Sequence, residues 1–167
     1  MHIRDEQRHD RAAVHRLNTL AFDTPAEADL VDALRGAAQP IVSLVADDDG
    51  TIAGHILFTP VSLPGHAELK IMGLAPMAVT PGRQRGGLGS QLVAAGLECC
   101  RRLGFGAVVV LGHPDFYPRF GFAPATRFGI GCAYDVPAEA FMAMELQPGY
   151  LAKASGTIRY HPAFDHL

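Results

Sequence analysis

The feature that most constrains the fold of this chain is a glycine-rich segment, Val79 to Ser90, between an apolar run and a long amphipathic stretch. Three of its glycines, Gly86, Gly87 and Gly89, would let the backbone approach a ligand closely. The amides that open a helix have no partner inside it and carry the positive end of the helix dipole. A strand, a glycine loop and a helix in this order therefore predict an anion site, which a phosphate or pyrophosphate would fit.

Two familiar phosphate loops do not match this segment. A P-loop ends in lysine followed by serine or threonine, and no lysine follows these glycines. A dinucleotide-binding loop would need glycine or alanine in place of Leu92, and an acidic residue near position 109, where three valines stand. The pattern that remains is Gln84, two residues, Gly87, one residue and Gly89.

This pattern resembles the coenzyme A pyrophosphate loop of the GCN5-related N-acetyltransferases (GNAT), with its glutamine or arginine and its two spaced glycines. The resemblance continues in 107–111, similar to the family's next strand, and in 117–122, similar to its tyrosine segment ending in Gly-Phe. Residues 141–164 also resemble a bacterial branch of mostly uncharacterised predicted acetyltransferases. The resemblance implies one α/β domain over 1–167, whose central sheet is mixed, mostly antiparallel, and contains a splayed parallel pair flanked by helices.

The resemblance also implies where acetyl-coenzyme A, the co-substrate, would bind. The amides of Arg85, Gly87, Gly89 and Ser90 would hold the pyrophosphate, and the end of the preceding strand would bond the pantetheine arm like an added strand. The side chains of Arg83 and Arg85 either meet phosphates or lie in solvent, and the sequence favours neither. The full expected coenzyme set is Met77, Ala78, Val79, Gln84, Arg85, Gly86, Gly87, Leu88, Gly89 and Ser90.

Acyl transfer from a thioester also needs a donor to the oxyanion and an acid for the departing thiolate. Pro76 has no N–H, so the amide of Met77 or Ala78 is the better donor near this point of the strand. Tyr117 is the expected acid, because it lies four residues before Gly121, as the acid of this family does. The alternative is that Tyr117 only packs against neighbouring aromatic rings.

No residue is clearly marked as the group that activates the amine. Glu27, His55 and His113 are candidates for the acceptor side, each with a structural alternative. Glu27 would complete a helix capping box with Thr24, and a histidine in mid-strand, such as His55, is more often structural. The histidines show no spacing typical of metal ligands, so we expect no metal.

We therefore expect an acetyl-coenzyme A dependent N-acetyltransferase whose acceptor amine attacks the thioester directly in a ternary complex. The preferred acceptor is a small molecule or an amino-acid-like compound. A protein or peptide amine is the alternative acceptor, and a non-catalytic acyl-coenzyme A sensor is the alternative without turnover. A glycine loop that merely makes a tight turn in an unrelated fold would leave the tyrosine segment unexplained.

Composition fits an enzyme of this size. A net charge of −3 gives no general reason to expect nucleic acid, and no apolar run is long enough to cross a bilayer. We expect a cytoplasmic protein with neither nucleic acid nor membrane as partner. Apolar residues near the C-terminus leave a homodimer open, although core packing explains each of them better; they are Tyr150, Leu151, Tyr160 and Phe164.

Periodicity and turn chemistry predict the order of elements. After a short strand near Ile3 we expect helices over about 10–22 and 25–36, then a hairpin of strands 41–46 and 51–59. A strand over 68–79 should bulge or splay at Pro76. The helix after the glycine loop should bury one stripe, allow close packing at Gly96 and end at Gly104; the stripe is Leu88, Leu92, Ala95, Cys99 and Leu103.

Overall fold

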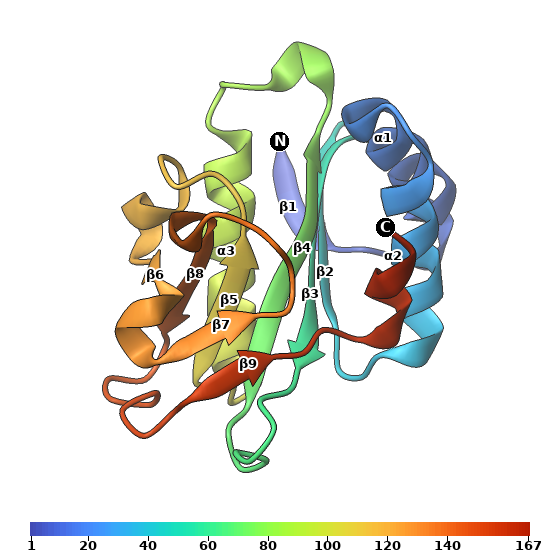
Figure 1. Ribbon diagram of the computed structural model, residues 1–167. Helices are drawn as coiled ribbons and strands as arrows, with labels where there is room; N and C mark the ends of the chain where they lie inside the picture. Colours follow the sequence, from blue (N-terminus) through green and yellow to red (C-terminus); the bar gives the residue numbers. More distant parts are fainter.

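A twisted seven-stranded sheet, with helices on both faces, organises the computed structural model, which describes residues 1–167 (Figure 1). The strand order is β1-β2-β3-β4-β5-β8-β6, and only β4 and β5 run parallel. These strands are β1 (His2–Asp5), β2 (Val42–Asp48), β3 (Thr51–Val61), β4 (Ile71–Val79), β5 (Ala107–Leu111), β6 (Ala123–Pro124) and β8 (Phe141–Glu145). The mixed, mostly antiparallel sheet expected from the sequence is confirmed.

The helices are α1 (Arg11–Phe22), α2 (Ala26–Ala37) and α3 (Leu88–Arg102). Helix α3 covers one face of the sheet, and α1 and α2 cover the other (Figure 1). A separate parallel pair, β7 (Ile130–Cys132) and β9 (Gly156–Ile158), packs beside the part of the large sheet that contains β5 and β8. Short 3-10 turns form several of the connections. No helix combines the length and the apolar character that crossing a bilayer requires.

The expected hairpin between β2 and β3 is present, because its turn residues suit the backbone they must adopt. Asp49 and Gly50 both have positive φ angles, 52° and 90°, as a tight hairpin turn with matching twist requires. The Gly50 N–H donates to Oδ1 of Asp47 at 2.7 Å, which fixes the turn.

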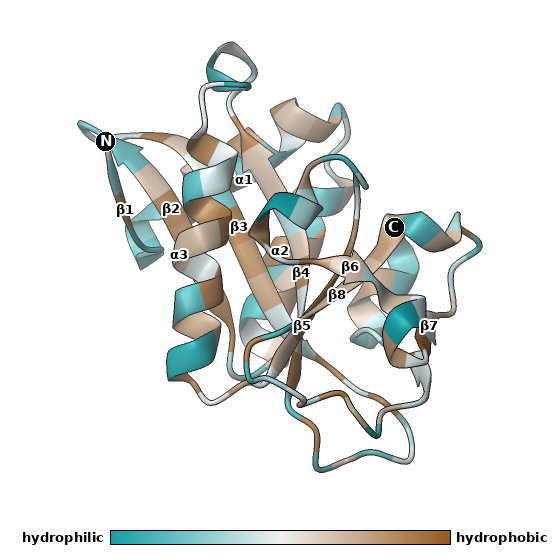
Figure 2. Cartoon of the chain, turned by 90° about the vertical axis from the view of Figure 1, so that its left-hand side faces the viewer, coloured by the Kyte–Doolittle hydropathy of each residue, from teal (hydrophilic) through white to brown (hydrophobic).

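Helix α3 packs against the sheet through a face that differs from the expected stripe. Leu88 and Leu92 are buried as expected, but Cys99 is only partly buried and Leu103 is 44% exposed. The buried line continues instead through Val93, Gly96, Leu97 and Cys100. In Figure 2 the strands β2 to β5 are mainly brown, whereas α3 shows brown and teal in turn.

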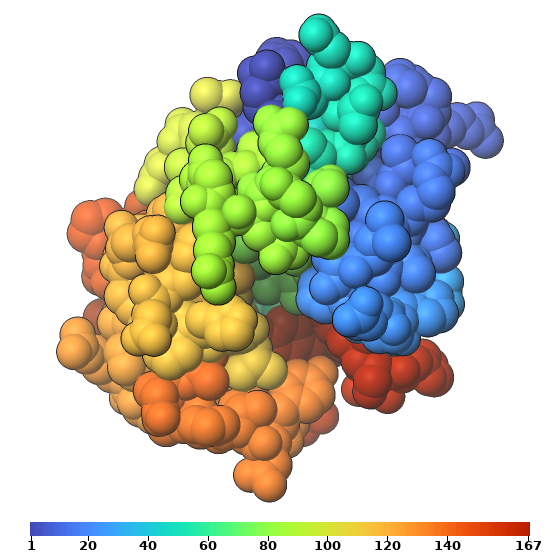
Figure 3. All heavy atoms as spheres, turned by 90° about the horizontal axis from the view of Figure 1, so that it is seen from above, coloured from blue at the N-terminus to red at the C-terminus, as the bar shows by residue number.

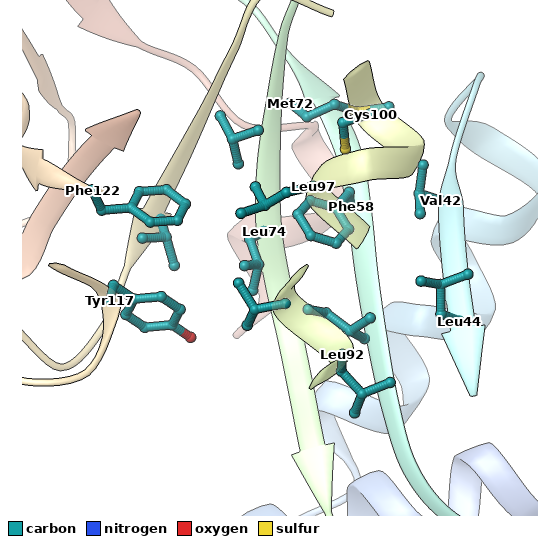
Figure 4. Packing of buried hydrophobic residues seen from close by; sticks show 14 of the residues in the cluster. Val42, Leu44, Phe58, Met72, Leu74, Leu92, Leu97, Cys100, Tyr117 and Phe122 are labelled. Atoms are coloured by element: carbon teal, nitrogen blue, oxygen red, sulfur yellow. The ribbon is translucent and has the colours of Figure 1, made fainter. Parts of the chain in front are cut away.

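The rotation follows from Gly96, where the backbone of α3 meets the ring of Phe58 on β3. A Cβ at Gly96 would lie well inside van der Waals contact with this ring. Phe58 is fully buried, and Figure 4 shows its ring turned toward the helix, near Leu97 and Cys100. The expected close approach at Gly96 is therefore confirmed, and it decides which side of α3 faces the sheet.

Replacing Gly96 by alanine should destabilise the protein by about 1–3 kcal/mol, because the methyl group must displace a buried ring. Gly36→Ala, near the end of α2, is the matched control: nothing lies within 4 Å of its added Cβ, and it should stabilise by about 0.5–1 kcal/mol. Urea unfolding of the two variants measures both effects. Equal stability of Gly96→Ala and wild type would contradict this packing.

The break in β4 lies where Pro76 predicts it. The pairing of β3 with β4 shifts register between Ile56 and Phe58, opposite Ala75 and Pro76, whose peptide bond is cis. Pairing of β4 with β5 stops at Leu74. From Ala75 to Val79 the edge of β4 that faces β5 has no strand partner, so the two parallel strands separate at their C-terminal ends.

The C-terminal apolar residues for which the sequence allowed a homodimer interface are mostly packed within the chain. Leu151 is 1% exposed and Phe164 is 6% exposed. The ring of Tyr160 lies over Gly73 on β4, and Tyr150 accepts a hydrogen bond from the Lys70 amide at 2.7 Å. The 3-10 turn Pro162–His166 closes against α2, which buries this segment. These residues therefore give no support to a dimer.

Candidate active site

The glycine loop presents a row of unpartnered amides at the start of α3. Among the backbone hydrogen bonds of turns, loops and helix caps, none is donated by an amide of residues 85–90. The first amide that bonds to the helix cap is that of Gln91, which donates to the Gly87 carbonyl at 3.1 Å. Gly87 caps the helix with a φ of 84°, and the first turn contains no acidic residue. The positive end of the helix dipole is therefore open to an anion.

Side chains of the loop divide into two roles. Gln84 Nε2 donates to the Val79 carbonyl at 3.1 Å, and this bond ties the loop to the end of β4. Arg83 Nη1 lies 2.6 Å from Oδ2 of Asp48 on the hairpin turn, and this guanidinium holds the pKa of Asp48 below its usual range. Arg85 is exposed and makes no ion pair, so it is the cation free to meet an anion in the loop. The sequence left phosphate contact and solvent exposure open for both arginines, and the structure distinguishes them, because Arg83 is paired with Asp48 and Arg85 is unpaired.

Three elements converge beside this loop. A Cβ at Gly89 would lie 3.5 Å from Cε of Met77 on β4 and 3.7 Å from Cζ of Phe116, in the segment after β5. The start of α3, the unpaired end of β4 and the tyrosine segment therefore meet where β4 and β5 separate. Residues 77–79 and 84–90, which the sequence selected for the coenzyme, lie around this point.

Tyr117 lies at the same place, on a 3-10 turn after β5. Its ring is 7% exposed and packs edge-on against Phe116 and Phe122, with centroids 5.0 and 5.7 Å away. The hydroxyl makes no hydrogen bond within the chain, yet it is not among the buried unpaired atoms, so it reaches an accessible surface. Figure 4 shows it pointing from this turn toward β4. Burial raises the pKa of Tyr117 to about 12, so the phenol stays protonated at neutral pH.

Gly112 makes this position of the tyrosine possible. A Cβ there would lie 2.5 Å from Cε2 of Tyr117, so only glycine lets the ring fold back onto the end of β5. The sequence contains this signal, a glycine directly after an apolar strand, but only the structure shows which ring it admits. His113, next to it, is exposed at the strand end, and its carbonyl accepts from the Phe116 amide at 3.1 Å.

His55 does not reach the acceptor side. It is fully buried in β3, with Nδ1 accepting from Asn18 Nδ2 at 3.3 Å and Nε2 lying 2.9 Å from the Ser43 hydroxyl, which donates to Glu6. Burial lowers the pKa of His55 to about 4, so the ring is neutral. Both ring nitrogens have hydrogen-bond partners, and His55 therefore links α1 to the sheet. This is the structural role that the sequence offered as the alternative to acceptor binding.

The capping box expected at Glu27 is absent. Helix α2 begins at Ala26, and its N-cap residue is Pro25, which has no side-chain cap hydrogen bond. The Thr24 hydroxyl accepts a hydrogen bond from the Ala26 amide at 3.3 Å. Glu27 is partly buried, and its Oε2 is buried with no hydrogen-bond partner. The structural explanation that the sequence offered for this carboxylate is therefore wrong, because Glu27 makes no cap bond and its Oε2 is buried instead.

Seen from the end where β4 and β5 separate, the molecule is hollowed (Figure 3). The hollow lies between the green glycine loop, the amber and orange segments after β5 and the blue corner between α1 and α2.

A separate cluster lies on the helix pair, where His15 is 2.9 Å from Asp29 and near Asp32. The two carboxylates are exposed and His15 is partly exposed, and no spacing in the sequence indicates this cluster.

The sequence model of the acetyltransferase (GNAT) domain matches residues 2–125. The chain belongs to the GNAT acetyltransferase family. Two curated members are similar to it over most of their length. An uncharacterised N-acetyltransferase YhbS of Escherichia coli is 36% identical, with both chains fully covered. An uncharacterised N-acetyltransferase YjhQ of Escherichia coli is 40% identical over 83% of this chain and 77% of its own.

Solved GNAT structures agree with this membership. The crystal structure of Escherichia coli YhbS in complex with coenzyme A has a TM-score of 0.92 and 36% identity, covering 98% of this chain and 91% of that one. A GNAT acetyltransferase from Brucella melitensis in complex with acetyl-coenzyme A has a TM-score of 0.81 and 36% identity, with coverage of 98% and 97%. These two GNAT proteins bind the coenzyme whose loop this sequence resembles.

Proposed function

We propose that this GNAT protein is an acetyl-coenzyme A dependent N-acetyltransferase that acts on a small-molecule primary amine. Two relatives with 36% identity bind coenzyme A or acetyl-coenzyme A. The observation that carries the proposal is the row of unpartnered amides from Arg85 to Ser90 beside the unpaired edge of β4. This arrangement suits a ligand with a pyrophosphate and an amide-bearing arm.

The reaction that this site supports is direct transfer. The amine nitrogen attacks the thioester carbonyl carbon, a C–N bond forms, and the carbonyl electron pair moves onto oxygen, where the amide of Met77 or Ala78 would stabilise the charge. When that pair returns, the C–S bond breaks and its electrons leave on sulfur. Tyr117 gives its proton to the thiolate, the nitrogen loses one proton to solvent, and Tyr117 regains one from solvent. The products are the acetamide and the coenzyme A thiol.

We prefer a small amine to a peptide end as the acceptor, because polar side-chain atoms are enclosed beneath the helix pair that borders the hollow. Three of the chain's four unpaired buried side-chain atoms belong to fully or partly buried residues of α1, α2 and β3, under the helix pair. Such enclosed groups are reached more readily by a small ligand than by a folded protein surface.

The proposal is tested by thiol release. Purified protein is mixed with acetyl-coenzyme A and a panel of primary amines and peptides, and free coenzyme A is measured against time. Saturable release with small amines, and acetylated product by mass spectrometry, is the expected result. Tight binding of acetyl-coenzyme A with no transfer to any amine would instead favour a sensor, and transfer to peptides alone would favour a protein acceptor.

A further inference from the structure

Unsatisfied buried polar atoms gather on one face of the sheet. The chain has four buried side-chain oxygens without a hydrogen-bond partner: Asn18 Oδ1, Glu27 Oε2, Thr59 Oγ1 and Tyr160 OH. Along β3, His55 and Leu57 contact the helix pair, while Ile56 and Phe58 belong to the cluster that contains α3. Thr59 continues the former series, so all four atoms lie on the face covered by α1, α2 and the C-terminal segment.

Glu27 is the charged member of this set, and its place on α2 explains why it points inward. Leu30, Val31 and Leu34 form the buried stripe of the helix, and Glu27 precedes them by three, four and seven residues. A carboxylate oxygen that is buried without a partner is costly, because it loses its bonds to water. Asp29, two residues on, is exposed and lies 2.9 Å from His15, so it already supplies negative charge to the same helix start.

Tyr160 marks the floor of the same face. Its ring lies 2.8 Å from the place of a Cβ at Gly73, the residue before pairing of β4 and β5 stops. Thr59 is the cross-strand partner of Gly73, so two of the unpaired oxygens flank one point of β4. Burial raises the pKa of Tyr160 above its usual range, which keeps the hydroxyl neutral and able to donate or accept. In Figure 3 parts of the green and the red chain segments are seen at the bottom of the hollow.

Apolar side chains border this face near the end of β5. Leu111, the last residue of β5, is 38% exposed, and alternation along the strand places it on the same side as Val109. Tyr134, after β7, is 39% exposed, and its ring centroid is 5.9 Å from that of Tyr160. Exposed large apolar groups next to buried polar atoms are typical of a small-molecule site.

We infer that the acceptor is a primary amine on an apolar or aromatic body, and that Glu27 is the residue that binds its nitrogen. The inference rests on the proposed function and adds the acceptor class to it. The carboxylate of Glu27 accepts hydrogen bonds from the amine or ammonium, and the body of the acceptor lies along Tyr160, Tyr134 and Leu111. Glu27 is then a binding residue that the folded chain leaves unsatisfied until the acceptor enters.

Two variants of Glu27 test this role. Glu27→Gln keeps the shape and removes the charge, and we expect at least a tenfold loss of kcat/KM for phenethylamine with the Kd for acetyl-coenzyme A unchanged. Glu27→Met places an apolar side chain on the buried stripe, and it should raise the melting temperature by about 2–4 °C because no orphaned carboxylate remains. Asp29→Asn, the exposed neighbour on the same turn, is the matched control: it should leave kcat/KM unchanged and should not raise the melting temperature, because it removes an exposed ion pair and not a buried carboxylate.

Each result decides the inference. A Glu27→Met protein that melts at or below the wild-type temperature would give Glu27 a folding role and overturn it, as would Glu27→Gln with wild-type kcat/KM. Wild type should also prefer phenethylamine to ethanolamine at least tenfold in kcat/KM, and an equal rate with ethanolamine would remove the apolar body from the acceptor class.

Failure of the proposed function is distinguishable from failure of this inference. If wild type binds acetyl-coenzyme A but acetylates neither amine, the transfer proposal fails for these probes. The coenzyme A complex is then titrated with phenethylamine by calorimetry. Binding that Glu27→Gln abolishes and Asp29→Asn retains would support the acceptor site, and absent or unchanged binding would overturn it.

Discussion

Replacing Gly89 by glutamate should weaken the binding of acetyl-coenzyme A at least 100-fold, or by about 3 kcal/mol. The new carboxylate would lie in the first turn of α3, next to the amides that have no hydrogen-bond partner and are expected to bind the pyrophosphate. The same helix dipole that favours a phosphate would favour this carboxylate, so the variant should remain folded. Calorimetric titration with acetyl-coenzyme A measures the loss, and thermal melting checks the fold.

Gly89 suits this experiment better than Gly87. The φ of Gly87 is 84°, a conformation that side chains adopt only with strain, whereas a Cβ at Gly89 makes ordinary contacts of 3.5 and 3.7 Å. Gly89→Ala is the control that adds volume without charge, and it should lose much less affinity than Gly89→Glu. If Gly89→Glu bound acetyl-coenzyme A within threefold of wild type, the coenzyme would not lie at this loop.

Removing the hydroxyl of Tyr117 should lower kcat by a factor of about 10²–10⁴, the usual range for a lost general acid. Tyr117→Phe should leave the Kd for acetyl-coenzyme A and the stability nearly unchanged, because this hydroxyl makes no hydrogen bond within the chain and the ring packing is preserved. Single-turnover measurement of thiol release isolates the chemical step from product release.

The control for Tyr117 is Tyr150→Phe, which removes a phenol bonded to the Lys70 amide at the start of β4, away from the glycine loop. It should keep the wild-type kcat. A phenol acts as an acid only below its pKa, and burial raises that of Tyr117 to about 12, so loss of its proton should not lower the rate of wild type up to about pH 10. Wild-type kcat in Tyr117→Phe would remove this residue from the mechanism.

The parts of the fold that the sequence predicted are those whose cause is local. The hairpin turn is defined by Asp49, a short polar residue that tolerates positive φ, and by Gly50, which lacks a Cβ; the helix start after the glycine loop depends on Gly87 for the same reason as Gly50. The separation of β4 and β5 follows from Pro76, which cannot bond in a regular ladder. Each feature needs only a residue and its neighbours, so it is readable without the rest of the chain.

Local signals failed where a distant partner decided the outcome. Periodicity placed Cys99 and Leu103 on the buried side of α3, but contact of Gly96 with Phe58 turned the helix toward Cys100. The spacing of Thr24 and Glu27 matched a capping box, yet Glu27 makes no cap bond and its Oε2 is buried, in line with its buried neighbours on α2.

The sequence by itself determined the family, the order of elements around the glycine loop, and the position of Tyr117 in the chain, because these depend on backbone chemistry at fixed spacing. Only the tertiary structure separated Arg85 from the Asp48-bound Arg83, enclosed His55 between α1 and the sheet, and left Glu27 buried without a partner. Such pairings join residues far apart in the chain, and burial and distance between them arise only when the sheet and its helices pack together.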